Sequence, residues 1–229
     1  MSASRDHILN KLRAARKPFP DAPPRPQPYR PVALLDDRST EGLLERFGRE
    51  VKNLLGECFV VEGDEAARGT ILDLLRAQQT TDLLAWDFNH IPVAGLEAAI
   101  RDAGIAIHYP ETHDEFRAET IETIRHAQVG LTGVDAAIAA TGTLVVSTGP
   151  GKGRIPTVLA PTHIAVVSLD QIVPRLEDWV ARQREIGLAA IQDRGNLCFI
   201  TGPSRTGDIE MQMILGVHGP GKVQVVVKR

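Results

Sequence analysis

The strongest constraint on the fold is an alternation of short apolar runs with longer segments of helical periodicity. Strand-length runs at 58–61, 83–86 and 105–109 are separated by segments such as 43–55 and 64–77, in which apolar residues recur every three or four positions. A strand that returns parallel to its neighbour needs a crossover of about a dozen residues, usually a helix. The sequence therefore predicts a three-layer α/β fold, with helices on both faces of one mostly parallel sheet of roughly six to eight strands.

The second half of the chain has shorter predicted elements. Thr132 and Asp135 have the spacing of a helix cap, so the Ala-rich stretch after them is predicted to form a short helix that ends by Gly142. The other predicted elements are a helix capped by Thr112 and reaching about His126, a strand from Thr143, a helix around Trp179, a helix from near Asp208 and a closing strand at 222–229.

The first 31 residues are predicted to form a region of their own, ahead of a compact domain at 32–229. Residues 4–12 have the pattern of a short amphipathic helix, and seven prolines within 18–31 favour a semi-rigid extended arm. Residues 1–30 hold seven basic and two acidic side chains, whereas the whole chain has a net charge of −3. Such a basic arm could dock on its own body, on a second subunit of a homo-oligomer or on another protein, and docking within an oligomer is the simplest interpretation.

Composition excludes several classes of function. The acidic net charge argues against a general nucleic-acid binder. Neither Cys58 nor Cys198 belongs to a C-x-x-C motif, so no iron–sulfur cluster or zinc ion is expected to be bound through cysteine motifs. The histidines lack paired metal spacing, and no metal site is expected. No apolar stretch approaches membrane-spanning length, and the N-terminus lacks the apolar core of a signal peptide, so a cytoplasmic protein is expected.

One candidate ligand loop follows the strand near residue 200, in the sequence ITGPSRTGDIE. Ligands of open α/β sheets bind beyond the carboxyl ends of strands, and Ser204, Arg205 and Thr206 could offer hydroxyls and a guanidinium to an anion. The competing interpretation is structural: Gly-Pro makes the turn, Thr206 or Asp208 caps a helix, and Arg205 pairs with a neighbouring acid. Both interpretations stay open.

Asp135 is the best carboxylate candidate for acid–base chemistry, because it is predicted to stand between a strand and a helix. The alternative is an ordinary first-turn carboxylate, which the helix dipole stabilises by about 0.3–1 kcal/mol. His163 and His218 are isolated, and a lone loop histidine is usually a solvated or hydrogen-bonded bystander.

The stretch LVVSTGPGKGRIP, residues 144–156, superficially matches a phosphate-binding loop. A P-loop needs Ser or Thr after its lysine and a helix immediately afterwards, but Gly153 follows Lys152 and Pro156 interrupts any helix. The same interruption excludes a dinucleotide-binding turn. The stretch is therefore predicted to be a mobile basic connector between two strands, with Lys152 and Arg154 as flexible contacts.

Three stretches in matching order, GVDAAIAATGTLVV, IPTVLAPTHIAVV and FITGPSRTGDIE followed by LGVHGP, resemble the LUD domain family of bacterial lactate utilisation C proteins. The resemblance covers roughly residues 35–229. The position before Thr141, often acidic or polar in that pattern, is Ala140 here.

The resemblance implies a fold similar to the sugar-isomerase and CoA-transferase group and a role in oxidising L-lactate to pyruvate. It also implies partner subunits that carry iron–sulfur ligands. Carried over by motif, the implied catalytic residue is Asp135. The implied ligand-binding residues are Thr132, Thr141, Gly142, Thr143, Thr201, Gly202, Ser204, Arg205, Thr206 and Asp208.

Three hypotheses of function follow. The first is a non-redox subunit of an L-lactate oxidation system that binds a small carboxylate or an anionic cofactor. The second is a stand-alone isomerase- or transferase-type enzyme acting on a phosphorylated sugar or a thioester, with Asp135 as its base. The third is a ligand-free scaffold whose basic arm binds a partner.

Overall fold

The structure is a computed structural model that describes residues 2–15, 34–110, 116–192, 194–207 and 213–229. The chain divides into two units, Met1–Val32 and Ala33–Arg229. Helix α1 (Ser2–Ala15) lies in the first unit and confirms the predicted N-terminal helix. All other elements lie in the second unit.

A six-stranded sheet forms the centre of the second unit, and every neighbouring pair in it is parallel. This sheet confirms the predicted α/β class, and its last strand confirms the predicted closing strand. Its strands in spatial order are β1 (Glu57–Val61), β12 (Lys222–Lys228), β7 (Thr162–Ser168), β4 (Val129–Thr132), β2 (Asp82–Ala85) and β3 (Ala106–His108).

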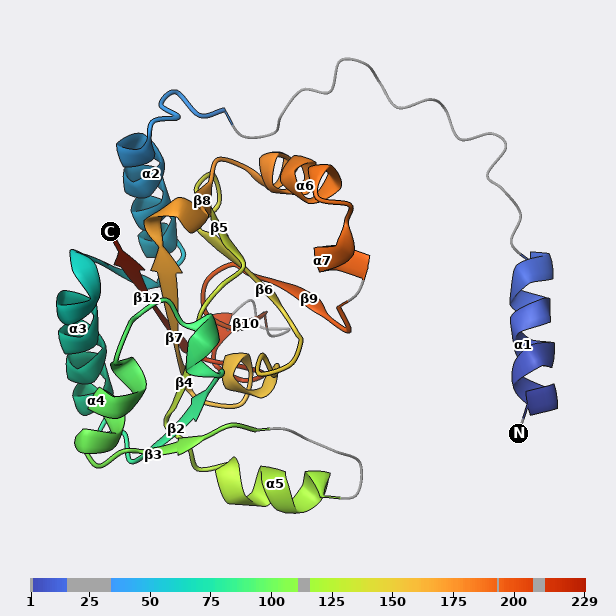
Figure 1. The fold of residues 1–229 in the computed structure, drawn as a ribbon, viewed down its shortest axis with the longest axis horizontal. Coiled ribbons are helices and arrows are strands. Elements are labelled where there is room, and N and C mark those ends of the chain that lie inside the picture. Colours follow the sequence, from blue (N-terminus) through green and yellow to red (C-terminus); the bar gives the residue numbers. More distant parts are fainter. Residues whose placement is uncertain (1, 16–33, 111–115, 193, 208–212) are drawn as a thin grey trace. The chain divides into compact units, whose positions relative to one another are not determined.

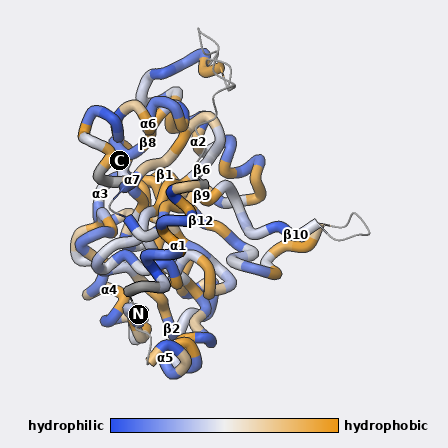
Figure 2. Tube along the Cα trace, turned by 90° about the vertical axis from the view of Figure 1, so that its right-hand side faces the viewer, coloured by the Kyte–Doolittle hydropathy of each residue, from blue (hydrophilic) through white to orange (hydrophobic). Residues whose placement is uncertain are grey.

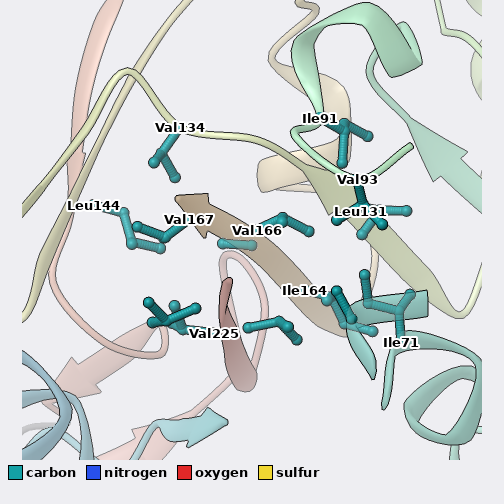
Figure 3. Packing of buried hydrophobic residues seen from close by; sticks show 14 of the residues in the cluster. Ile71, Ile91, Val93, Leu131, Val134, Leu144, Ile164, Val166, Val167 and Val225 are labelled. Atoms are coloured by element: carbon teal, nitrogen blue, oxygen red, sulfur yellow. The ribbon is translucent and has the colours of Figure 1, made fainter. Parts of the chain in front are cut away.

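Helices α3 (Gly63–Ala77) and α4 (Leu96–Asp102) cover one face of this sheet (Figure 1). Ile71 and Leu75 recur at helical spacing in α3 and are fully buried, which is why the segment forms a helix against the sheet. Figure 3 shows Ile71 in the same cluster as Ile164 and Leu131 of the central strands. Helix α2 (Thr40–Asn53), which Ser39 caps through a 3.1 Å bond from the Gly42 amide, contacts β1. Helix α5 (Arg117–Ile124) confirms the end of the helix predicted to reach about His126, but Thr112, its predicted cap, lies outside the described residues.

A second sheet, mostly antiparallel, shows that the prediction of a single sheet was wrong. Its strands in order are β8 (Ile172–Val173), β5 (Ala136–Ile138), β6 (Thr143–Ser147) and β9 (Leu197–Ile200). Val134 and Leu144 from this region pack in the same buried cluster as Val167 of the central sheet (Figure 3). Helix α6 (Leu176–Glu185), predicted around Trp179, packs on β5 and β8, and α7 (Ala189–Gln192) follows it.

The helix predicted after Asp135 is likewise replaced by strand β5. Alanine is the best helix former, but residues 136–140 are all buried between neighbouring elements. Small side chains let β6 and β8 approach β5 on both sides, and these pairings override the local helical preference.

A short antiparallel hairpin, β10 (Arg205–Gly207) and β11 (Met213–Leu215), stands where the sequence predicted a helix from near Asp208. Residues 213–215 are therefore strand and not helix, whereas Asp208 itself lies outside the described residues. Figure 2 shows this hairpin projecting from the sheets, and Met213, Ile214 and Leu215 leave much of their apolar surface exposed.

Candidate functional site

The order of the central strands locates the candidate site. Strand β3 is added on one side of β2, and the next strand of this sheet along the chain, β4, is added on the other side. Strands β7 and β12 then continue in the direction of β4. The order in which strands are added therefore reverses between β2 and β4. In α/β proteins such a reversal leaves a crevice outside the carboxyl ends of the two strands, and ligands bind there. The residues that follow β2 and β4 are therefore the candidate site.

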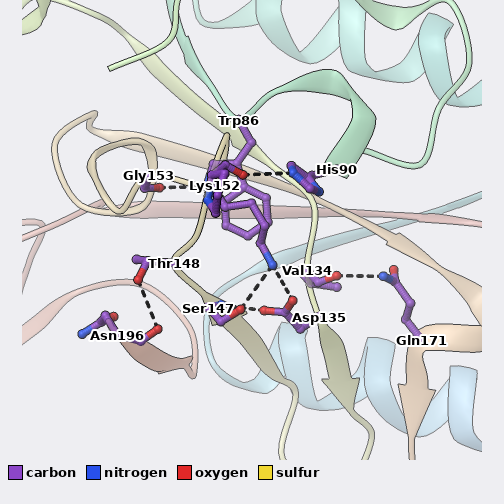
Figure 4. A network of polar contacts seen from close by, with 11 residues as sticks. Trp86, His90, Val134, Asp135, Ser147, Thr148, Lys152, Gly153, Gln171 and Asn196 are labelled. Atoms are coloured by element: carbon purple, nitrogen blue, oxygen red, sulfur yellow. Dashed lines mark hydrogen bonds and ion pairs between the residues drawn. The ribbon is translucent and has the colours of Figure 1, made fainter. Parts of the chain in front are cut away.

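Asp135 follows β4 and lies at this edge of the sheet. Its amide donates to the Val145 carbonyl at 2.8 Å, and the preceding residue is held by Gln171, whose amide side chain donates to the Val134 carbonyl at 2.7 Å (Figure 4). The Asp135 carboxylate accepts a 2.5 Å bond from the Ser147 amide through Oδ2 and a bond from Lys152 Nζ through Oδ1. The carboxylate is thus held in one orientation by two donors.

Lys152, which the sequence predicted only as a flexible contact, is the second member of this ion pair. Its side chain is only 7% exposed, whereas that of Asp135 is 29% exposed. Nζ also lies 3.3 Å from Ser147 Oγ and 4.8 Å from the centre of the Trp86 ring, a cation–π distance (Figure 4). The site is therefore an ion pair whose cation is enclosed and whose carboxylate faces outward.

We call residues 149–153 the glycine loop, and contacts with the end of β2 hold it in place. The Trp86 indole N–H donates to the Gly153 carbonyl at 2.8 Å, and the Asp87 amide donates to the Gly151 carbonyl at 2.8 Å. A ring nitrogen of His90 lies 3.1 Å from the Pro150 carbonyl oxygen. The prediction of a mobile basic connector was wrong, because the lysine is buried and the backbone around it is bonded to a neighbouring strand end.

Two glycines permit this close packing. Gly151 has a φ of +68°, and a Cβ atom there would lie 2.8 Å from the Cβ of Asp87. A Cβ on Gly133, just before Asp135, would lie 2.0 Å from the His90 carbonyl oxygen. Because glycine has no Cβ, other groups can come close to the backbone at these two positions. The groups that do so are the protein's own Asp87 side chain and His90 carbonyl.

Thr132 is buried beneath the site. Its hydroxyl lies 2.9 Å from Nε2 of His163, and neither side chain is exposed to solvent. Burial lowers the pKa of His163 to about 4, so the ring is neutral near pH 7. His163 thus lies in strand β7 (Thr162–Ser168) and not in a loop, and of the two expected alternatives, solvated or hydrogen-bonded, it is the hydrogen-bonded one.

Of the remaining predicted site residues, Asp208 lies outside the described residues, and the others lie at the other end of the second sheet. Thr143 Oγ1 lies 2.7 Å from Thr141 Oγ1 and 2.9 Å from Thr201 Oγ1, so the three hydroxyls form a row. Gly142, with a φ of +60°, lies against the backbone of helix α2, where a Cβ would meet Val51 N at 2.8 Å. The structure brings these residues together, but around helix α2.

We call residues 201–205 the arginine loop. Arg205 donates to the carbonyl oxygen of Leu54, the C-cap of helix α2, and the Ser204 backbone bonds to Pro220 and Gly216 at 2.8 and 2.9 Å. Gly202 also packs on Leu54. Thr206 is opposite Ile214 in the hairpin.

Antiparallel pairing explains why the predicted site residues fall into two groups. Ser147 pairs with Leu197, whereas Leu144 pairs with Ile200, so the loops that follow β6 and β9 leave opposite ends of the second sheet. The strand β6 between these ends spans about 13 Å at about 3.3 Å per residue. Asp135 therefore lies beside the glycine loop, at the opposite end of the second sheet from Arg205. Among the described residues, no hydrogen bond or ion pair links Asp135 to Arg205.

Metal-ligand clusters and membrane-spanning helices are both absent from the described residues. No three His, Cys, Asp or Glu side chains among them are grouped so that they could hold a metal ion. Within the same residues, no helix combines the length and apolar character needed to cross a membrane.

The fold and site define an α/β protein with an enclosed lysine–carboxylate pair at the reversal point of a parallel sheet. The chain belongs to the LUD domain family, whose model matches residues 44–227. It is 31% identical over 206 residues to a lactate utilization protein C of Macrococcus caseolyticus, covering 89% of this chain and 83% of that protein. It is 27% identical over 225 residues to a protein of the same name from Shouchella clausii, covering 97% and 94%.

A solved structure shares the fold. The crystal structure of a DUF162 family protein from Deinococcus radiodurans aligns with a TM-score of 0.59 and 21% identity, over 84% of this chain and 100% of that one. This likeness bears on the fold alone and supports the mixed α/β architecture with its parallel central sheet.

Proposed function

We propose that this chain is a cytoplasmic, non-redox subunit of a system that oxidises L-lactate to pyruvate, and that it binds a small anionic ligand beside Asp135 and Lys152. The proposal is supported by the family membership and by the name that its relatives carry, lactate utilization protein C. Its partners in this proposal are subunits that carry iron–sulfur centres.

The ion pair of Asp135 with Lys152 is the observation that carries the proposal. The ammonium is enclosed, and the Asp135 carboxylate remains partly exposed at the carboxyl end of β4. A carboxylate oriented by fixed donors can accept a proton from a hydroxyl group within hydrogen-bond reach. Oxidation of L-lactate to pyruvate breaks the hydroxyl O–H bond and the α-C–H bond and releases two protons and two electrons. In this proposal Asp135 accepts the hydroxyl proton, and the α-hydrogen leaves with the two electrons, as a hydride equivalent, to a redox centre of a partner subunit.

The positions of the cysteines fit a subunit that borrows its redox centre. Cys58 lies on β1 of the central sheet and Cys198 on β9 of the second sheet. Burial raises the pKa of the Cys58 thiol to about 11, which keeps it protonated and a poor metal ligand near pH 7. The proposal therefore assigns electron transfer to the partners.

Gene deletion tests the role directly. A strain lacking this gene, with the neighbouring genes intact, should fail to grow on L-lactate as sole carbon source and should grow normally on pyruvate. Restoring the gene should restore growth on L-lactate. Unimpaired growth of the deletion strain on L-lactate would remove the proposed role.

A second candidate is a stand-alone acid–base enzyme acting on a phosphorylated sugar or a thioester. The partly exposed, firmly oriented Asp135 carboxylate is what favours it. In that case the purified chain alone should turn over such a substrate, and Asp135→Asn should abolish turnover. Turnover that survives the substitution would exclude Asp135 as the base.

A further inference from the structure

A large cavity adjoins the glycine loop and contains none of the described residues that the sequence predicted for the site. Its volume is about 860 Å³, and it opens beyond the ends of β2 and β3, with Gly153, Arg154 and Tyr109 in its wall. Ligand pockets for cofactor-sized molecules range from about 300 to 1,000 Å³. L-lactate, a three-carbon acid, would occupy a small part of this space.

Two arginines line the cavity. Arg154 and Arg117 both line it with exposed side chains, and Arg154 makes no ion pair with any carboxylate of the described residues. The nearby acid Glu97 is already engaged, because it accepts a 2.7 Å bond from the Tyr109 hydroxyl and a 2.8 Å bond from Arg101. An arginine forms charge-assisted, often bidentate, bonds to phosphate, sulfonate or carboxylate groups.

The same cavity has an apolar wall. Tyr109 and Val158 line it with 43% and 44% of their surface exposed, and Leu159 and Ile121 also contribute. The Tyr109 ring is held in place by an edge-on contact with Phe88, 6.3 Å between ring centres, and by its hydroxyl bond to Glu97. Covering such apolar surface removes it from water, which favours binding of a ligand with an apolar body.

We propose that this cavity binds an amphipathic organic anion of cofactor size, with its anionic group on Arg154 and an aromatic or apolar body against Tyr109 and Val158. Asp87, whose carboxylate caps the Asn89 amide at 2.9 Å, offers an acceptor to hydroxyl or amine groups of the same ligand. The inference goes beyond the proposed function, because it requires no role in lactate metabolism.

Fluorescence titration with anilinonaphthalene sulfonate, an aromatic anion, tests the proposal on the purified full-length chain. The probe should bind saturably, Arg154→Gln should weaken binding about tenfold through loss of one charge-assisted contact, and Val158→Asp should abolish it. Arg76→Gln, which removes an exposed arginine paired with Asp73 on helix α3, is the matched control and should leave binding unchanged.

Two outcomes would overturn the proposal. In the first, binding survives Arg154→Gln and Val158→Asp but is lost in Ile214→Ser, which would assign the probe to the exposed hairpin. In the second, L-lactate at millimolar concentration displaces the probe, which would make the cavity a site for small carboxylates. Neither outcome depends on growth on lactate, so failure here is distinguishable from failure of the proposed function.

Discussion

The glycine loop and the arginine loop look alike in sequence but make opposite use of their basic residue. Each follows a strand of the second sheet and combines glycine, proline and one basic side chain. In the glycine loop Lys152 turns inward onto Asp135 and Trp86, whereas in the arginine loop Arg205 bonds to the end of helix α2. The role of the basic residue therefore depends on the groups that the fold places around it, and not on the composition of the loop.

The largest expected effect concerns the backbone packing behind the glycine loop. A Cβ on Gly130 of β4 would lie 1.8 Å from the Pro156 carbonyl oxygen, in the short helix η2 (Ile155–Thr157) that follows the loop. Gly130→Ala should therefore lower the free energy of unfolding by about 3 kcal/mol, measured by urea denaturation. Gly69→Ala, in an open position of helix α3, is the control and should stabilise the protein by about 0.5–1 kcal/mol. Equal stability of the two variants would contradict the packing described here.

The next effect is a pH dependence that arises from His163 beneath the site. Because burial lowers its pKa from 6.5 to about 4, the unfolded state binds a proton more readily than the folded state between these values. The contribution of neutral His163 to the free energy of unfolding is fully present above about pH 6.5. It is lost as the pH falls toward 4, which lowers the free energy of unfolding by up to about 3 kcal/mol. His163→Gln should flatten this part of the stability curve. His218→Gln, at an exposed position, serves as the control, and an unchanged curve in His163→Gln would exclude His163 as the source.

Lys152→Met tests the ion pair. The substitution keeps the apolar contact with Trp86 but leaves the Asp135 carboxylate without its cation, and it should destabilise the fold by about 2 kcal/mol. Removing one partner of a fully buried ion pair destabilises a protein by about 3–5 kcal/mol. The expected loss is smaller here because water reaches the Asp135 carboxylate. Thermal and urea denaturation would measure the loss. A change below about 0.5 kcal/mol would show that the pair contributes little to stability.

The smallest expected effect is that of the matched substitution in the arginine loop. Arg205→Met removes one hydrogen bond from an exposed side chain to the Leu54 carbonyl, which water can replace, so stability should fall by no more than about 0.5 kcal/mol. The same denaturation experiments apply. A loss as large as that of Lys152→Met would mean that the two loops are energetically equivalent and would break the comparison.

Much of the central sheet was predictable because its strands are short apolar runs that alternate with regular helices, and because the inner strands β4, β7 and β12 are almost entirely buried. The pattern predicted α3 and the strand at 58–61 almost to the residue. The second sheet was not predictable in this way, because local helix propensity in 136–140 conflicts with pairing partners that are distant in sequence. Had 136–138 and 143–147 been interpreted as a hairpin, its register would have placed Asp135 beside Ser147 and the lysine that follows it.

The central claim is that the end of the second sheet with Asp135 and Lys152 is the functional end, and that the end with Arg205 is structural. The most direct test is to complement a deletion strain with Asp135→Asn or Arg205→Met and measure growth on L-lactate, with both proteins quantified by immunoblot. The account predicts that Arg205→Met restores growth and that Asp135→Asn, present at a comparable level, does not. Growth restored by Asp135→Asn but not by Arg205→Met would contradict it.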